Sequence, residues 1–402
     1  MRQTDFGGIK MSKEFFEDSF TVDKDCSLKP ANIHTGEDAN AEHYRRAGRA
    51  WQSAPCTVKT KGGRLYCTFS GDNSNVGDES PNNYNVLIYS DDNGKTWYEN
   101  ELIIDHSDSV RIHGPLMFVE ESGKLWLFWA QSYIYWDSRG GVWCITCDNP
   151  DAEKLKWSEP RRLCHGVLAT PPIVTSWGEM LLPVSIWKNI TRHKFNHLPE
   201  LEYSCVYASS DGGESFTLVG KANDPDTTFD ENTLAELPDK TLVMTLRDEK
   251  AISICFSKDR GRTWTEPKKL MDHTSSRSFL ATFPSGNLLL VTNDPEGTDL
   301  SERNQMTAFL SEDGGKTFPH KLLLYKEPNV SYPAGMITKD GTVYVSFDRN
   351  RYTDSEMFLA IFREEDIRAG KCITEGSTPH KLILRADESH GKHKIYDDGT
   401  TW

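Results

Sequence analysis

Apolar residues recur along this chain in six short runs of similar pattern, and a polar turn introduces each run. The runs are nearly continuous in apolar residues, as expected for strands that are buried on both faces. They read GGRLYCTFS, SGKLWLFWA, WGEMLLPVS, PDKTLVMTL, SGNLLLVTN and DGTVYVSFD. Their turn residues are Gly63, Gly123, Gly178, Asp239, Gly286 and Gly341. Six such units of roughly 50–60 residues predict a repeat architecture built from short strands.

A second repeat lies between the apolar runs and marks hairpin turns. The pattern Ser-x-Asp-x-Gly-x-Thr/Ser-Trp/Phe occurs four times, and a degenerate copy spans residues 146–157. The four complete copies span residues 90–97, 209–216, 257–264 and 311–318. In a turn of this kind the Asp accepts backbone N–H bonds, the Gly supplies a positive φ, and the aromatic residue packs under the hairpin. Each copy follows a β-rich segment, which favours a hairpin at that point.

Together the two repeats predict an all-β fold, a six-bladed β-propeller with Asp-box turns. The propeller is expected to span residues 49–370, with residues 1–48 as an N-terminal extension and residues 371–402 as a partly mobile C-terminal segment. The N-terminal extension is our candidate for a strand that closes the ring, since an unclosed ring would leave an exposed edge. Few segments have a helical pattern, and the clearest is a short turn at Glu364–Gly370.

Composition narrows the range of partners. The 402 residues include 46 Lys and Arg against 60 Asp and Glu, which gives a formal net charge of −14. This acidic balance argues against nucleic acid and anionic membranes as main partners, although a local basic pocket for a small acidic ligand is compatible with it. No apolar run approaches the roughly 18 residues of a membrane-spanning helix.

Cysteine usage and the N-terminus favour a cytoplasmic protein. The nine cysteines are an odd number and are scattered, so we expect buried, reduced thiols. Cys144 and Cys147 form a CxxC, but without a second such pair they are read as strand residues, and we expect no metal and no cofactor. The first residues lack the apolar core of a signal peptide. The oligomeric state stays open.

Candidate chemistry is expected where loops of all blades meet at one mouth of the ring. We expect the six apolar runs to be the innermost strands of the blades, and ionisable residues flank them at this mouth. They are Arg49, Asp72, Asp78 and Glu79 in blade one, Arg111 and His113 in blade two, Glu231, Glu236, Arg247 and Asp248 in blade four, Asp294 and Arg303 in blade five, and Tyr332, Asp348, Arg349 and Arg351 in blade six.

At several of these positions the chain resembles the sialidase (neuraminidase) superfamily, as a divergent bacterial-type member, over about residues 49–366. The segment DENTLAELPDKTLVMTLR is similar to the one that carries a Glu and ends in an Arg in that family, which places Glu231 and Arg247 on the pattern. RNQMTAFLSEDGG places Arg303 ahead of the last Asp-box, and VSYPAGM places Tyr332 before the last apolar run.

The resemblance implies a retaining exo-glycosidase that removes a terminal acidic sugar, either sialic acid or a related keto- or uronic acid, from a glycan. Arg247 and Arg303 would bind the substrate carboxylate in a bidentate geometry that Lys cannot reproduce. By the same resemblance Tyr332 would be the nucleophile, since sialidases use a tyrosine in this role. A phenol with a pKa of about 10 needs a nearby base, and Glu231 would fill that role.

One departure from the family concerns carboxylate binding. Sialidases begin blade one with Arg-Ile-Pro, and this Arg is the first of three that bind the carboxylate. The corresponding tripeptide here begins with Ser53 and continues Ala-Pro, so that Arg is missing. Arg49, Arg111 and Arg277 are candidates to replace it, and His113 is a further candidate for substrate binding next to Arg111.

A second departure concerns the catalytic acid. The acid/base Asp of sialidases lies in the loop that leaves blade one, and this loop offers Asp72, Asp78 and Glu79 without a unique match. We favour Glu79, which lies just ahead of the segment NNYNVLIYS.

Two other functions stay open at this point. A polysaccharide lyase acting on a uronate-containing glycan would use His113 with Tyr133 or Tyr135 as the base and an Arg to neutralise the carboxylate. A non-catalytic carbohydrate-binding propeller is the other alternative, because a fold of this kind hosts several functions.

Overall fold

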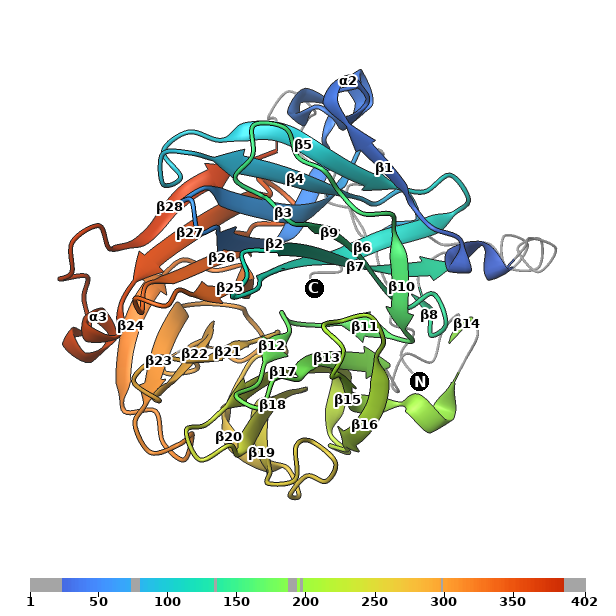
Figure 1. Cartoon of the computed structure of the whole chain (residues 1–402). Helices are drawn as coiled ribbons and strands as arrows, with labels where there is room; N and C mark the ends of the chain where they lie inside the picture. The colour runs from blue at the N-terminus through green and yellow to red at the C-terminus, as the bar shows by residue number, and fades with distance from the viewer. Residues whose placement is uncertain are drawn as a thin grey trace.

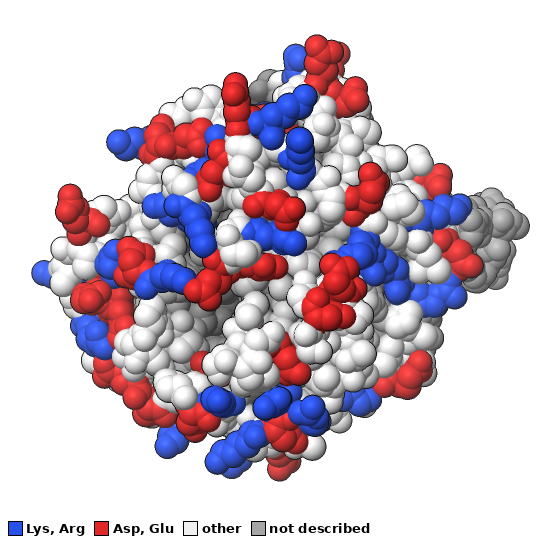
Figure 2. Space-filling model, in the orientation of Figure 1, with Lys and Arg blue, Asp and Glu red and all other residues white. Residues whose placement is uncertain are grey.

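A computed structural model describes residues 24–73, 80–133, 136–186, 194–195, 198–297 and 299–386 of the chain. Six antiparallel sheets follow one another around a central axis, so the predicted six-bladed β-propeller is confirmed (Figure 1). The face shown in Figure 2 is hollowed near the centre of the ring, and acidic and basic side chains are interspersed over it.

In the first three blades the strands follow one another from the axis outward in this order. Blade one consists of β2 (Trp51–Lys59), β3 (Leu65–Asp72), β4 (Tyr84–Ser90), β5 (Tyr98–Asp105) and β1 (Asn32–Thr35). Blade two consists of β6 (Val110–Val119), β7 (Leu125–Tyr133), β9 (Val142–Cys147) and β10 (Arg161–Cys164). Blade three pairs both β11 (Val167–Leu168) and β12 (Ile173–Val174) with β13 (Met180–Ile186), followed by β15 (Tyr203–Ser209) and β16 (Thr217–Ala222). A small separate sheet joins β8 (Trp136–Asp137) to β14 (Lys194–Phe195).

The last three blades have four strands each. Blade four consists of β17 (Thr227–Glu236), β18 (Leu242–Asp248), β19 (Ala251–Ser257) and β20 (Lys268–Asp272). Blade five consists of β21 (Phe279–Thr282), β22 (Leu288–Asn293), β23 (Met306–Ser311) and β24 (His320–Tyr325). Blade six consists of β25 (Val330–Ile337), β26 (Val343–Arg349), β27 (Glu356–Phe362) and β28 (Thr378–Leu384).

Helical segments are short. The helix predicted near the end of the propeller is confirmed as α3 (Glu364–Ala369), and α2 (Gly36–Ala39) lies between β1 and β2 of blade one. Four 3-10 turns complete the described elements: η1 (Lys24–Leu28), η2 (Glu42–Tyr44), η3 (Arg46–Gly48) and η4 (Pro199–Leu201). Within the described ranges no helix has both the length and the apolar character needed to cross a membrane.

The six apolar runs form the second strand of each blade. Five of these strands, β3, β7, β13, β18 and β22, are buried at every residue, and β26 is buried at all but its last, so the prediction of burial on both faces is confirmed. They are not the innermost strands, however, which corrects the sequence-based reading. Both faces of a second strand are covered by the neighbouring blades, whereas the innermost strand borders the axis and carries more polar residues.

The Asp-box turns have the predicted hydrogen bonds. In the copy of blade four, Ser257 Oγ donates to Asp259 Oδ1 at 2.8 Å, the backbone N–H of Gly261 donates to Ser257 Oγ at 2.9 Å, and the N–H of Thr263 donates to Asp259 Oδ1 at 2.9 Å. The other three copies repeat these contacts. Trp264 is partly buried and packs against the apolar core between blades three and four.

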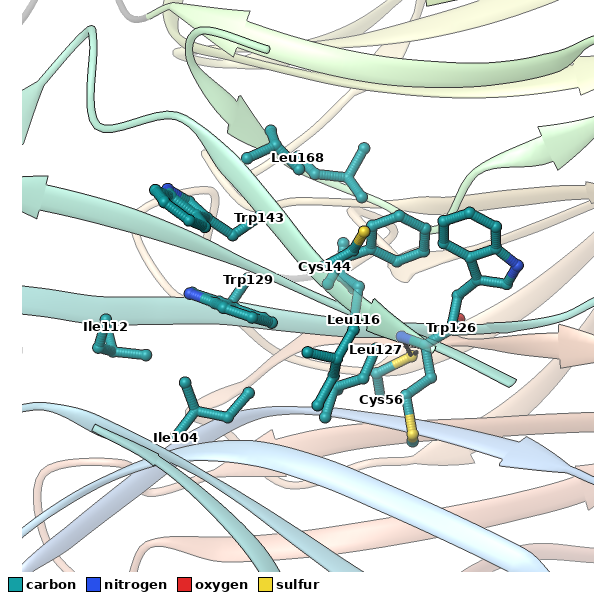
Figure 3. Close-up of a cluster of buried hydrophobic side chains, with 14 of the residues drawn as sticks. Cys56, Ile104, Ile112, Leu116, Trp126, Leu127, Trp129, Trp143, Cys144 and Leu168 are labelled. Carbon is teal, nitrogen blue, oxygen red and sulfur yellow. Dashed lines mark hydrogen bonds between the residues drawn. The ribbon is translucent and has the colours of Figure 1, made fainter. Parts of the chain in front are cut away.

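Apolar contacts between blades form the core. In Figure 3, side chains of blade two such as Trp126 and Trp129 pack with Cys56 of blade one and Leu168 of blade three. The Asp-box turns join this packing. A Cβ atom on Gly213 would lie 2.5 Å from Cη2 of Trp126, so only glycine fits where the turn of blade three meets blade two.

The two ends of the chain differ from expectation. Strand β1 of the N-terminal extension pairs with β5 at the outer edge of blade one, and β28, beyond the expected boundary at 370, is the outer strand of blade six. Side chains join the two blades, as Gln52 Nε2 donates to the Ser355 carbonyl at 2.9 Å and Lys59 Nζ to Tyr344 Oη at 2.8 Å. Among the described residues no strand is shared between blades one and six, which are joined by packing and by side-chain hydrogen bonds.

Acid sensitivity of the Asp-box turns can be tested at Asp259. Hydrogen bonds from Thr263, through its hydroxyl and its backbone N–H, lower the pKa of Asp259 to about 2. The ionised Asp259 carboxylate therefore adds to the free energy of unfolding above a pH of about 4, the pKa of Asp in the unfolded chain. This contribution is lost as the pH falls through 2. We expect Asp259→Asn to lower the free energy of unfolding by about 1 kcal/mol at pH 7, and the difference from wild type to vanish near pH 2, in urea titrations across this range.

Asp148 offers the matched control, since it occupies the same place in the degenerate turn of blade two. Its side chain is 85% exposed and contacts Lys124 Nζ at 3.3 Å. Asp148→Asn should leave stability nearly unchanged. An equal loss in both variants would contradict the hydrogen-bond explanation.

Candidate active site

Three innermost strands carry a bulge just before a proline, and one of these bulges positions a predicted site residue. The register of β2, β6 and β25 shifts at this point. The bulged residues with positive φ are Ala54 (56°), Gly114 (58°) and Tyr332 (56°). Bulky side chains rarely adopt this left-handed conformation, and such strain is typical of functional sites. The bulge in β25 interrupts the regular alternation of side chains along the strand and thereby sets the direction of the Tyr332 side chain.

Guanidiniums of blades five and six surround the ring of Tyr332. The Cζ atoms of Arg351, Arg277 and Arg303 lie 4.1, 4.8 and 5.0 Å from the ring centroid. At such distances a cation is attracted to the ring face. Arg277 and Arg351 are buried, whereas Tyr332 and Arg303 keep partial access to solvent. A ligand could therefore approach the phenol from the solvent side.

Glu231 and Arg247 of blade four complete this cluster. Arg247 Nη1 donates to Glu231 Oε2 at 2.5 Å, and only 4% and 10% of the two side chains are exposed. Arg247 Nη2 and Arg303 Nη2 both donate to the carbonyl of Ser275, at 2.9 and 2.8 Å. One backbone carbonyl thus aligns the two arginines. Tyr332, Glu231, Arg247 and Arg303, from three blades, are brought together as the sequence predicted.

The charges of this cluster act on Tyr332. Burial raises the pKa of Tyr332, but Arg303, Arg247 and Arg351 outweigh burial and the Glu231 carboxylate, so the pKa lies below its usual value of 10. Burial lowers the pKa of Arg303, and repulsion from Arg247 and Arg351 adds to this effect although Tyr332 opposes it. The phenol therefore ionises more easily than an ordinary tyrosine.

The cluster has an excess of positive charge and fits an anion. Among the residues that the structure describes, four guanidiniums face two carboxylates, which leaves two positive charges in excess. The members are Arg247, Arg277, Arg303, Arg351, Glu231 and Asp348. Since charge of one sign is costly to bury, a bound anion would relieve it. A planar carboxylate matches the donor geometry of arginine best.

Asp348 ties Arg351 to the seam between blades one and six. Asp348 is fully buried, and its Oδ2 accepts hydrogen bonds from Arg351 Nη2 at 2.9 Å, from the backbone N–H of Ala54 at 3.0 Å and from the Ser53 hydroxyl. Its Oδ1 accepts from Ser331 Oγ at 2.6 Å, and Arg351 Nη2 donates to Ser331 Oγ at 3.0 Å. The sequence placed Asp348 and Arg351 near the mouth but assigned no role to them, because the contact between Asp348 and Ser53 joins residues 295 positions apart in the chain.

Arg49 has a structural place in blade one, which corrects its prediction as a substrate-binding residue. It is fully buried, and its guanidinium donates to Gln52 Oε1, the Tyr44 carbonyl and Asn100 Oδ1 at 3.1, 3.1 and 3.2 Å. It also lies over the ring of Phe69, 5.0 Å from the centroid. These contacts hold the N-terminal segment against the blade.

Arg277, another of the candidates that the sequence left open, contacts residues of two other blades. Its Nη1 donates to the carbonyl of Ala169 in blade three at 2.7 Å, while its guanidinium lies over Tyr332 of blade six. Its Nε has no hydrogen-bond partner among the residues that the structure describes. Arg277 therefore links blades three, five and six.

Arg111 and His113, the candidates of blade two for substrate binding, are both buried, with 4% and 5% of each residue exposed. His113 Nε2 shares a hydrogen bond with Ser132 Oγ at 3.1 Å, and burial, followed by the charge of Arg111, holds the pKa of His113 well below its usual value. Tyr133 is 1% exposed. Tyr135 lies outside the described residues. A buried neutral histidine of this kind is typical of a structural role.

The acid/base candidates of blade one are placed only in part. Asp72 is buried, and its Oδ2 accepts hydrogen bonds from Ser80 Oγ at 2.5 Å and Asn83 Nδ2 at 2.9 Å. These hydrogen bonds join the end of β3 to the residues that precede β4. Asp78 and Glu79 lie outside the described residues, so Glu79 stays a prediction. In the described part of the chain, no three His, Cys, Asp or Glu side chains are grouped to hold a metal.

Comparisons with known proteins agree with this architecture. A family model described as the BNR repeat-like domain matches residues 63–345. A sialidase of Paraclostridium sordellii is 26% identical over 200 residues, which cover 44% of this chain and 48% of that protein. The match thus spans about half the length of this curated relative.

Two solved structures have a similar fold. The Hadza microbial sialidase Hz136 superposes with a TM-score of 0.59 at 21% identity, covering 79% of this chain and 66% of that chain. A leech intramolecular trans-sialidase, solved with 2,7-anhydro-Neu5Ac, superposes with a TM-score of 0.60 at 12% identity, covering 89% and 73% of the two chains. Identities this low establish a likeness of fold alone.

His273, buried beside the arginines, predicts a pH dependence of stability. Burial, then Arg247 and Arg303, lower its pKa to about 3, and its Nε2 shares a hydrogen bond with Thr292 Oγ1 at 2.6 Å. The folded protein therefore keeps His273 neutral, whereas the unfolded chain takes up a proton below about pH 6.5. Stability is full above that pH and falls as the pH drops toward 3.

We expect His273→Gln to have a shallower fall than wild type between pH 6.5 and 3, by up to about 1.4 kcal/mol per pH unit in denaturant titrations. Thr292→Val is the control, because it removes the hydrogen-bond partner but keeps the titrating ring, and its slope should match wild type. Identical slopes in wild type and His273→Gln would refute the assignment.

Proposed function

The chain belongs to the family of BNR repeat-like domains, and on this premise we propose that it is a sialidase-like exo-glycosidase. It would hydrolyse a terminal acidic sugar, sialic acid or a related keto- or uronic acid, from a glycan. The observation that supports this best is the Tyr332 phenol, which lies beside Glu231 in a cluster of guanidiniums. A sugar carboxylate supplies the anion that such a cluster favours.

In the first step, Arg247 and Arg303 hold the substrate carboxylate through parallel N–H bonds and set the anomeric carbon against Tyr332. Glu231 takes the phenolic proton as the phenol oxygen bonds to the anomeric carbon, and the bond to the leaving oxygen breaks. A phenol suits this task because a carboxylate nucleophile would be repelled by the substrate's own carboxylate.

In the second step, water attacks the glycosyl-tyrosine intermediate, and the phenol leaves with its proton returned from Glu231. The leaving oxygen of the first step needs a proton, and the water of the second must lose one. We assign both transfers to Glu79 in the loop that leaves blade one. Two displacements at one carbon retain the anomeric configuration.

The two alternative functions have less support. Elimination would require His113 as a base, but it is buried and hydrogen-bonded to Ser132. A purely binding propeller would use the same guanidiniums but would have no need of a carboxylate beside a tyrosine of lowered pKa.

The function can be tested with 4-methylumbelliferyl glycosides of N-acetylneuraminic acid, related keto-acids and uronic acids. We expect hydrolysis of at least one, with the retained anomer formed first in NMR spectra. Tyr332→Phe should lower kcat by roughly three orders of magnitude, because the nucleophile is lost, and leave the affinity for the free acidic sugar within a few-fold. Tyr325→Phe is the matched control. Arg349 lies 5.5 Å from the centroid of that ring, outside the cluster, so full activity should remain.

Each alternative has its own outcome in this experiment. Full turnover by Tyr332→Phe would exclude the covalent mechanism. Products that absorb in the ultraviolet through a new C=C bond would select the lyase. Binding of acidic sugars without turnover of any glycoside would select the binding propeller.

A further inference from the structure

We propose that Arg351 of blade six binds the substrate carboxylate as a third arginine beside Arg247 and Arg303. It takes over from a guanidinium that the sialidase pattern places at the start of blade one, where this chain has Ser53. The inference rests on the proposed function, since it names the residue that completes the same carboxylate-binding set.

Arg351 belongs to the charge cluster by position. Its Cζ lies 4.1 Å from the centroid of the Tyr332 ring, closer than those of Arg277 and Arg303. Its charge also acts on both Tyr332 and Arg303. A carboxylate that Arg303 held beside the phenol would therefore also be attracted by Arg351.

Arg351 is also held in place before any ligand binds. Its side chain is 8% exposed, and its Nη2 donates to Asp348 Oδ2 and Ser331 Oγ at 2.9 and 3.0 Å. Because the Arg351 side chain is already fixed in the free protein, it loses less conformational entropy when a ligand binds. This arrangement is typical of a binding residue with a dedicated support.

Ser53 supports Arg351 through the shared carboxylate. Its hydroxyl and the N–H of Ala54 donate to Asp348 Oδ2, the atom that also accepts from Arg351. The start of blade one thus contributes to the site through two hydrogen bonds to Asp348, and the positive charge itself comes from the last blade. Compared with the sialidase pattern, a guanidinium is kept at the seam between blades one and six, but it comes from blade six instead of blade one.

Arg349 provides a matched control in the same segment. Its Nη1 donates to Glu356 Oε2 at 2.9 Å, and its guanidinium lies over Tyr325, 5.5 Å from the centroid. It therefore has the same charge two residues away but different neighbours from Arg351.

The test compares acidic sugars with their neutral esters. N-acetylneuraminic acid and glucuronic acid, each with its methyl ester, are titrated by NMR into wild type, Arg351→Gln, Arg351→Lys and Arg349→Gln. We expect wild type to bind one acid at least about tenfold more tightly than its ester. Arg351→Gln should weaken binding of that acid by about tenfold and leave ester binding within twofold. Arg351→Lys should recover only part of the loss, and Arg349→Gln should match wild type.

Melting temperatures establish that each variant is folded, and the Lys variant carries the comparison if Arg351→Gln does not fold. An unchanged acid-over-ester preference in the Arg351 variants would overturn this inference and leave the proposed function standing. A wild-type protein that neither prefers the acids nor hydrolyses any acidic glycoside would overturn the proposed function, and this inference with it.

Discussion

One buried carboxylate, that of Asp348, joins the closure of the ring to the organisation of the site. It receives hydrogen bonds from Ser53 and Ala54 of blade one and from Ser331 and Arg351 of blade six. A buried charge that lost such partners would cost about 3–5 kcal/mol. The first and last blades therefore cannot slide past each other without breaking this set, and the bulge beside Ser331 that aims the phenol is held by the same bonds.

The rim of the site carries costs that the rest of the fold offsets. Four guanidiniums lie near one another, and Tyr332 is held at a φ of 56°. Such strain persists only where the surroundings fix the backbone firmly. Here the support comes from second strands that are buried almost throughout, and from Asp-box turns whose hydrogen bonds repeat from blade to blade. Regular blades thus permit an irregular, highly charged centre.

Features that depend on short stretches of sequence were predicted correctly. The Asp-box turns and apolar runs carry their own hydrogen bonds and burial, so the count of blades was right. Tyr332, Arg303, Glu231 and Arg247 flank such runs, and the structure brings them together. The position of each apolar run within its blade was wrong, because continuous burial describes any strand covered on both faces and does not distinguish the first from the second.

Contacts between residues that are far apart in the chain could not be predicted from short sequence patterns. Arg49 was taken for a binding residue because it precedes blade one, yet its guanidinium turns to Tyr44 and Asn100. The role of Arg351 was missed because its support, Ser53, is almost 300 residues away in the chain and becomes a neighbour only when the ring closes. A side chain as long as arginine can point to either side of its strand, and spacing alone does not fix the choice.

A propeller makes an exchange of arginines between blades physically reasonable. All six innermost strands converge on one mouth, so guanidiniums from adjacent blades can reach the same point from different directions. The loss of an arginine at the start of blade one is therefore weak evidence against a carboxylate site, provided that a neighbouring blade supplies the charge and a buried acceptor orients it. Asp348 is that acceptor, and because it also closes the seam, the geometry of the binding site depends on the closed ring in this chain. A charged residue that is missing from one blade of a propeller can therefore be supplied by the adjacent blade.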